Sequence, residues 1–114
     1  MKTLVTNDDG VYAPGLWTLV AEIKKLGEVV VVAPDREQSG VGTSVTFHQP
    51  LRFKEVPSLV TGVPAYSVEG TPADCVILAL RYLFPDQIGM VISGINEGAN
   101  LGGDAYISGT VGAA

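Results

Sequence analysis

The chain has 114 residues, 46% of them hydrophobic, and a formal net charge of −5 at pH 7. Its length and apolar content suit one domain with a single core, and its acidic balance excludes a surface built to neutralise nucleic-acid phosphates. Its one cysteine, Cys75, excludes an internal disulfide, and no stretch approaches the ~20 apolar residues that span a bilayer. We therefore expect one cytoplasmic domain over residues 1–114 that acts on a small ligand, without a membrane or a nucleic-acid polymer as partner.

The first third of the chain predicts a βαβ unit. Residues 3–6 suit a short buried strand, and residues 14–26 suit a helix whose apolar side chains recur on one face. Residues 28–33 then include four consecutive valines, a β-branched run typical of a strand covered on both faces. Two strands joined by a helix of this length are parallel, and the crossover between them is right-handed.

The middle of the chain predicts short strands. Prolines and glycines separate three segments that favour strands or a hairpin. They are residues 43–47, 51–56 and 65–68. Their brevity distinguishes this part of the chain from the βαβ unit before it.

The last third predicts two helices with a strand between them. Thr71 is placed to cap a helix that starts at Pro72 and runs to about Phe84. Residues 88–92 suit another central strand, and residues 108–110 read as the start of a further helix. Barely one turn of that helix is present, so we expect the chain to be the N-terminal part of a longer one.

Two adjacent carboxylates, Asp8 and Asp9, follow the first predicted strand at the point where the chain must turn. Open α/β sheets keep their ligand sites outside the carboxyl ends of their strands. Two neighbouring negative charges repel one another, and a divalent cation offsets that repulsion. An ordinary polar turn is the alternative, because Asp-Gly is a common turn dipeptide. The segment Asn7-Asp8-Asp9-Gly10 alone leaves both interpretations open.

Oxygen-bearing side chains follow two other predicted segments. Asn96 follows the strand at 88–92, so it lies on the same rim of the sheet as the acidic pair. Ser39 lies in a polar loop. Carboxylate, hydroxyl and amide oxygens select magnesium, calcium or manganese over zinc or copper(I), and the spacing does not match an EF-hand. A metal site follows only if the fold brings these residues together.

A glycine-rich segment over residues 94–110 ends in Ser108-Gly109-Thr110. At a helix N-terminus, free backbone N–H groups and the helix dipole attract anions, so a phosphate would suit this position. The segment lacks the spacing of a dinucleotide-binding fingerprint or a Walker A loop. A glycine-rich connection without a ligand is therefore the alternative.

Five segments of the chain resemble, in order and spacing, the signatures of the SurE family of metal-dependent nucleotide phosphatases. They are Leu4-Val5-Thr6-Asn7-Asp8-Asp9-Gly10 with Ala13-Pro14-Gly15, Ala33-Pro34-Asp35-Arg36-Glu37-Gln38-Ser39-Gly40, Gly70-Thr71-Pro72-Ala73-Asp74-Cys75-Val76, Ser93-Gly94-Ile95-Asn96 and Ser108-Gly109-Thr110-Val111. The resemblance implies an α/β fold of the Rossmann-like, three-layer, doubly wound type with a mainly parallel sheet. Because family members are considerably longer, it also implies that the fold is truncated on its C-terminal side.

The resemblance further implies a single nucleotidase domain that hydrolyses nucleoside 5′- or 3′-monophosphates to nucleoside and phosphate with one divalent ion, Mg²⁺ or Mn²⁺. Asp8 and Asp9 would be catalytic. The implied metal ligands are Asp8, Asp9, Ser39 and Asn96, and the implied phosphate-binding residues are Asn7, Gly40, Ser108, Gly109 and Thr110. The later part of family members carries an oligomerisation arm, so the full-length protein is expected to form a homodimer or tetramer.

The chain departs from the family pattern at two positions. Ile107 stands where relatives commonly carry His or Tyr, which removes a polar contact to phosphate, and Ala99 stands where Pro is usual.

A phosphoacceptor signalling domain also has an acidic pair after its first strand, but it needs a later lysine, and no lysine follows Lys54. A non-catalytic metal- or nucleotide-binding fragment stays open as the alternative, because a chain of this length could bind without turnover.

Three conspicuous side chains are expected to have no chemical role. Cys75 shares a predicted helical face with apolar residues, which is typical of core packing. Trp17 lies early in the first helix and is expected to pack. His48, the one histidine, is expected in a solvated loop.

Overall fold

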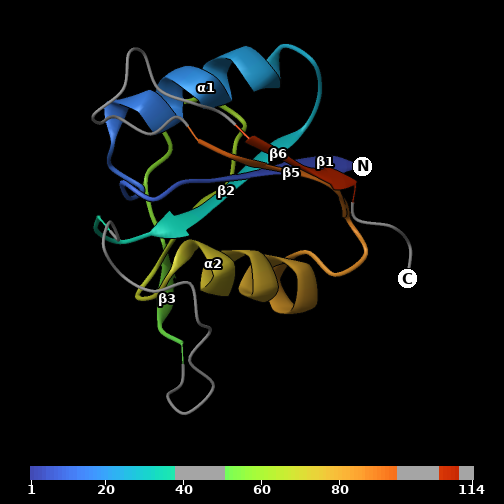
Figure 1. Cartoon of the computed structure of the whole chain (residues 1–114). Helices are drawn as coiled ribbons and strands as arrows, with labels where there is room; N and C mark the ends of the chain where they lie inside the picture. The colour runs from blue at the N-terminus through green and yellow to red at the C-terminus, as the bar shows by residue number, and fades with distance from the viewer. Residues whose placement is uncertain (38–50, 95–105, 111–114) are drawn as a thin grey trace.

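A computed structural model describes residues 1–37 and 51–94 and the backbone of residues 106–110. Helices connect β1 to β2 and β4 to β5, as expected for an α/β domain (Figure 1). The elements are β1 (Lys2–Thr6), α1 (Pro14–Lys24), β2 (Val29–Pro34), β3 (Phe53–Glu55), β4 (Ala65–Val68), α2 (Pro72–Leu78), the π-helical turn η1 (Ala79–Leu83), β5 (Ile88–Ser93) and β6 (Tyr106–Thr110).

One sheet with the strand order β3-β4-β2-β1-β5-β6 organises the described part of the chain. Strands β4, β2, β1 and β5 run parallel, while β3 and β6 are antiparallel to their neighbours at the two edges. Helix α1 covers one face and α2 the other, which makes three layers (Figure 1). The predicted Rossmann-like, doubly wound fold with a mainly parallel sheet is therefore confirmed.

Two hydrophobic cores lie on opposite faces of the sheet. The core under α1 includes Leu16 packed with Val29 and Val31, and the core under α2 includes Val30 and Val32. Because successive side chains of a strand point to opposite faces, β2 contributes to both cores, and each of its valines is 2% exposed or less. The β-branched run therefore marks a central strand, as predicted.

Helix α2 begins with a reciprocal cap. The Thr71 hydroxyl accepts a hydrogen bond from the Asp74 backbone N–H at 3.1 Å, and the Asp74 carboxylate accepts one from the Thr71 N–H at 2.9 Å. Such a cap stabilises a helix by about 1 kcal/mol. The predicted cap is confirmed, and η1 extends the helix to Leu83, next to the predicted end at Phe84.

Within the described ranges, no helix combines the length and the apolar character needed to cross a membrane.

The middle of the chain forms a hairpin at one edge of the sheet. Strand β3 pairs antiparallel with β4, and Lys54 lies opposite Ser67. All three residues of β3 are exposed, as is usual for a short edge strand. The hairpin interpretation is confirmed for the segments at 51–56 and 65–68, while the predicted strand at 43–47 lies outside the described residues.

Residues 106–110 correct one prediction. We expected Ser108 to open a helix, whereas Tyr106–Thr110 form strand β6, paired antiparallel with β5. Without that partner, the edge of β5 would present unpaired backbone N–H and C=O groups. The β-branched residues Ile107 and Thr110 also suit a strand. Pairing with the open edge therefore replaces the predicted helix.

The sheet has a topological switch point between β1 and β5. From β1 the chain crosses through α1 to β2 on one side, and from β4 it crosses through α2 to β5 on the other side of β1. The two crossover helices lie on opposite faces (Figure 1). In doubly wound sheets, ligands bind in the crevice outside the carboxyl ends of the strands at such a point. The fold therefore favours a site at the ends of β1 and β5.

Candidate functional site

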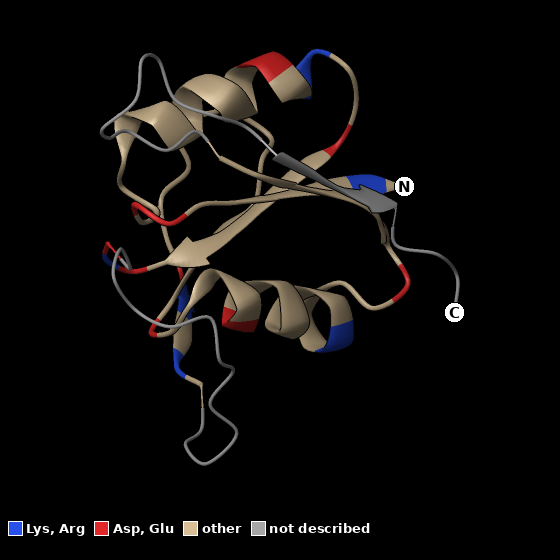
Figure 2. Cartoon of the chain, viewed as in Figure 1, with Lys and Arg blue, Asp and Glu red and all other residues tan. Residues whose placement is uncertain are grey.

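Three segments meet at the carboxyl edge of the sheet, namely the turns that follow β1, β2 and β5. The Val11 N–H donates to the Pro34 carbonyl at 2.7 Å, which ties the turn after β1 to the end of β2. The Gly94 N–H donates to the Thr6 carbonyl at 3.0 Å, which ties the end of β5 to the end of β1. Figure 2 shows acidic residues, in red, in the turns after β1 and β2. This edge therefore joins the segments that precede or carry every predicted metal ligand.

The turn after β1 is held by Asn7 and Gly10. The Asn7 side chain is fully buried, its Nδ2 donates to the Gly10 carbonyl at 3.0 Å, and its Oδ1 accepts from the Gly10 N–H at 3.1 Å. Gly10 has a φ of +105°, and a Cβ there would lie 3.1 Å from the carbonyl carbon of Arg36. Glycine alone meets both demands without strain. These two residues fix the backbone on either side of Asp8 and Asp9, and we call residues 7–10 the acidic turn.

Asp8 and Asp9 are the carboxylates that the acidic turn presents. Both are partly exposed, at the end of β1 where the sheet has its switch point. A divalent cation fits this pair, because it offsets two negative charges and prefers hard oxygen ligands. In the part of the chain that the structure describes, no group of three or more Asp, Glu, His or Cys side chains converges. Hydroxyl and amide oxygens are further donors that suit such a cation.

The other two predicted metal ligands, Ser39 and Asn96, lie outside the described residues, as does the predicted phosphate contact Gly40. Ser39 comes two residues after Glu37 in the segment that leaves β2, and Asn96 comes two residues after Gly94 in the segment that leaves β5. Both segments start next to the acidic turn. The structure therefore describes half of the predicted metal set, and the other half stays a prediction.

The remaining predicted phosphate contacts have different outcomes. Asn7 is buried and bonded to Gly10 through both of its side-chain polar atoms, so it shapes the acidic turn, and its assignment to a phosphate stays a prediction. The backbone of Ser108, Gly109 and Thr110 lies in β6, so these residues do not form a helix N-terminus. Their assignment to a phosphate stays a prediction, without the helix dipole that motivated it.

Two of the side chains expected to pack are buried. Cys75 is fully buried, and burial raises the pKa of its thiol well above the usual range, so the thiol is unreactive. Trp17 is 6% exposed, and its Nε1 donates to the Val11 carbonyl at 2.7 Å. This bond ties α1 to the residue that follows the acidic turn. His48 lies outside the described residues.

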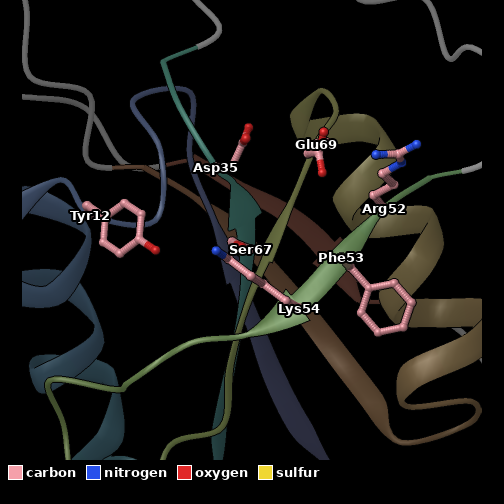
Figure 3. A pocket seen from close by; sticks show the side chains of 7 residues that line it. All are labelled: Tyr12, Asp35, Arg52, Phe53, Lys54, Ser67 and Glu69. Carbon is pink, nitrogen blue, oxygen red and sulfur yellow. The ribbon is translucent and has the colours of Figure 1, made fainter.

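A pocket of about 260 Å³ lies beside the acidic turn, and no sequence motif predicted it. Its lining residues are Tyr12, Asp35, Arg52, Phe53, Lys54, Ser67 and Glu69 (Figure 3). In the sequence, the one available signal is the position of Tyr12, two residues after Gly10. Asp35 directly follows β2, and the remaining lining residues reach the pocket through the β3–β4 hairpin, whose pairing no local motif specifies.

Comparison with known proteins identifies the family. The chain matches the family described as Survival protein SurE over residues 3–114. Proteins named 5′-nucleotidase SurE from Dehalococcoides mccartyi and Legionella pneumophila are 60% and 55% identical to it over 114 residues, covering 100% of this chain and 43% of each relative. A crystal structure of SurE protein from Aquifex aeolicus aligns with a TM-score of 0.73 at 48% identity, covering 90% of this chain and 40% of that one. The chain thus spans less than half the length of these relatives, and it belongs to the SurE family.

Proposed function

We propose that this chain supplies the metal-binding part of a divalent-metal-dependent nucleotidase, which hydrolyses nucleoside 5′- or 3′-monophosphates to nucleoside and phosphate. The observation that carries the proposal is the acidic turn at the carboxyl end of β1, beside the switch point of the sheet. The names of the curated relatives support nucleotidase activity, and the oxygen donors support a divalent metal ion.

The metal ion would be held by oxygen atoms from four residues, Asp8, Asp9, Ser39 and Asn96. When bound, magnesium or manganese polarises the phosphoryl oxygens and lowers the pKa of a coordinated water. The chain contributes a site that is arranged in advance, because the bonds between Asn7 and Gly10 hold the acidic turn before any substrate arrives.

A carboxylate of the acidic turn also serves as the general base. Asp8 and Asp9 are partly exposed, so either one accepts a proton from a water molecule at the sheet edge and passes it to solvent. A positioned base of this kind accelerates a reaction by about 10²–10⁴-fold. Gly40 and residues 108–110 would orient the phosphate for attack.

A non-catalytic metal- or nucleotide-binding fragment is the second candidate. Because the chain spans 43% of the length of its curated relatives, groups that turnover requires can lie beyond it. Binding without release of phosphate would favour this candidate.

The predicted homodimer or tetramer and the cytoplasmic location belong to the proposal for the full-length protein. Light scattering after size exclusion measures the assembly.

Release of phosphate from nucleoside monophosphates tests the proposal, measured on the intact protein with Mn²⁺, with Mg²⁺ and with EDTA. We expect release only with a metal ion, and a loss of about 100-fold or more in Asp9→Asn, which removes a ligand charge and a candidate base. Asp86→Asn is the matched control, because Asp86 lies in an exposed turn before β5, where its φ of +62° suits asparagine. Unchanged turnover in Asp9→Asn would contradict the proposal.

A further inference from the structure

Two of the residues that line the pocket, Tyr12 and Asp35, belong to segments that adjoin the acidic turn (Figure 3). Tyr12 stands two residues after Gly10, and Asp35 directly follows β2. The hydrogen bond of 2.7 Å from the Val11 N–H to the Pro34 carbonyl joins these two walls. A ligand whose phosphate lies at the acidic turn can therefore extend its remaining atoms into this pocket.

Tyr12 presents its ring from a fixed piece of backbone. Its neighbour Val11 is 1% exposed, and the Val11 carbonyl accepts a hydrogen bond from Trp17 Nε1 at 2.7 Å. The Tyr12 side chain itself is 64% exposed. A flat aromatic ring on a rigid support, open to solvent on one side, is suited to stacking against a planar ligand.

The β3–β4 hairpin forms the opposite wall. Lys54 lies across from Ser67 in the register, and Ser67 is 2% exposed. Figure 3 shows the Lys54 side chain extending past Ser67 toward Tyr12. The Phe53 ring points away from the pocket, and its centroid lies 6.3 Å from that of the Tyr66 ring. Tyr12 therefore supplies the ring available for stacking in this pocket.

The charges around the pocket are balanced. The lining includes two cations, Arg52 and Lys54, and two carboxylates, Asp35 and Glu69. A second phosphate would be favoured by a net positive lining and a second metal ion by a net negative one. Hydrogen-bond donors and acceptors in equal supply instead suit a neutral ring that itself carries both, and a volume of about 260 Å³ suits a ligand smaller than most drugs.

We propose that this pocket binds the nucleoside part of the substrate, with the base stacked on Tyr12 and its polar edge bonded to Lys54 and to the carboxylates at the rim. The inference rests on the proposed nucleotidase function, because the phosphate must lie at the acidic turn. It makes Tyr12 a residue that determines preference for nucleotides over simpler phosphate esters.

Hydrolysis of a nucleoside monophosphate and of ribose 5-phosphate, which lacks the base, tests this inference on the intact protein. The readout is the ratio of the two kcat/KM values. We expect Tyr12→Ala to lower the ratio about tenfold, the usual effect of losing one base–aromatic stack, while Tyr12→Phe keeps it within about twofold of the unmodified protein. Tyr82→Ala is the matched control, since Tyr82 is 72% exposed on η1, away from the pocket.

Calorimetric binding of adenosine, which carries no phosphate, separates this inference from the proposed function. If adenosine binds, Tyr12→Ala weakens it and no phosphate is released from any substrate, the pocket is supported and the nucleotidase proposal fails. If phosphate is released but the ratio and adenosine binding are the same in Tyr12→Ala, the pocket inference fails alone. An equal loss on both substrates in Tyr12→Ala would also overturn it, because the defect would then lie in the acidic turn.

Discussion

The two ends of the parallel sheet make different demands on the sequence. At the carboxyl end, Asn7 is fully buried and Gly10 holds a φ of +105° against the backbone of Arg36. At the amino end, Leu26 is 85% exposed, and a Cβ on Gly27 would meet nothing within 4 Å. Buried polar groups and a glycine packed against neighbouring backbone mark the end that carries the candidate site. At the amino end, the connecting residues expose their side chains to water.

The hollows at the two ends differ in the same way. The pocket at the carboxyl end is lined by cations, carboxylates and a hydroxyl. The hollow beside the amino ends of β1 and β2, of about 440 Å³, is lined largely by apolar side chains, among them Met1, Leu26 and Met90. A few well-placed polar groups orient a specific ligand in its site. The apolar hollow, although larger, is therefore less suited to binding a reacting ligand than the pocket at the carboxyl end.

The largest expected effect comes from breaking the acidic turn at Gly10. An alanine there would have to keep a φ of +105° and place its Cβ 3.1 Å from the Arg36 carbonyl carbon. We expect Gly10→Ala to lower the free energy of unfolding by about 3 kcal/mol, measured by urea denaturation. Gly27→Ala makes the same change at the amino end and should alter that free energy by less than about 1 kcal/mol. Equal effects at the two ends would contradict the comparison.

Removing the Asn7 amide should have the next largest effect. Asn7→Ala leaves the buried N–H of Gly10 without its partner and removes one of the two donors to the Gly10 carbonyl, which keeps the Ala13 N–H at 3.1 Å. We therefore expect a loss of about 2 kcal/mol of unfolding free energy. Ser58 is the matched control, because its hydroxyl donates to the Val60 carbonyl at 2.8 Å and accepts from the Val60 N–H at 3.2 Å in a partly buried turn. Water can replace that hydroxyl, so Ser58→Ala should lose less than about 1 kcal/mol. A larger loss at Ser58 would overturn this ranking.

The smallest expected effect is electrostatic and lies at the amino end. Lys2 Nζ lies 3.1 Å from Glu28 Oε2, and its hydrogen bond and charge lower the pKa of Glu28. A lowered folded pKa stabilises the fold above the unfolded pKa of the carboxyl group, and this stabilisation is lost as the pH falls through the folded value. An NMR titration should find the Glu28 pKa low in the unmodified protein and ordinary in Lys2→Met, with a smaller difference in high salt. A Glu28 pKa that is the same in both proteins would show that the pair does not form in solution.

The fold could be predicted from the sequence where local signals agreed with long-range pairing. The valine run of β2, the cap at Thr71 and the bounds of β4 all appear in the structure as expected. At Ser108 the local signal and the long-range pairing disagreed. The Ser-Gly-Thr sequence favours a helix start, whereas the open edge of β5 favours a strand. A local motif carries no information about which edge is free, so the sequence could not decide between them.

The candidate site was predictable to a similar extent. Asp8 and Asp9 stand together in one segment after a strand, which makes the pair visible without a structure. The positioning role of Asn7 was not visible, because its burial depends on how the acidic turn packs against the end of β2. The approach of Lys54 to Tyr12 depends on the pairing of β3 with β4, which brings together residues far apart in the chain.

A thermal melt with and without Mn²⁺ tests the metal site most directly, measured on the intact protein, on Asp9→Asn and on the control Asp86→Asn. A ligand that binds only the native state raises the melting midpoint, and at 100 times its Kd it adds about 2.7 kcal/mol of stability. We predict that Mn²⁺ raises the midpoint of the unmodified protein and of Asp86→Asn and leaves that of Asp9→Asn in place. A cooperative melt that Mn²⁺ does not move, or an equal shift in Asp9→Asn, would contradict a metal site at the acidic turn.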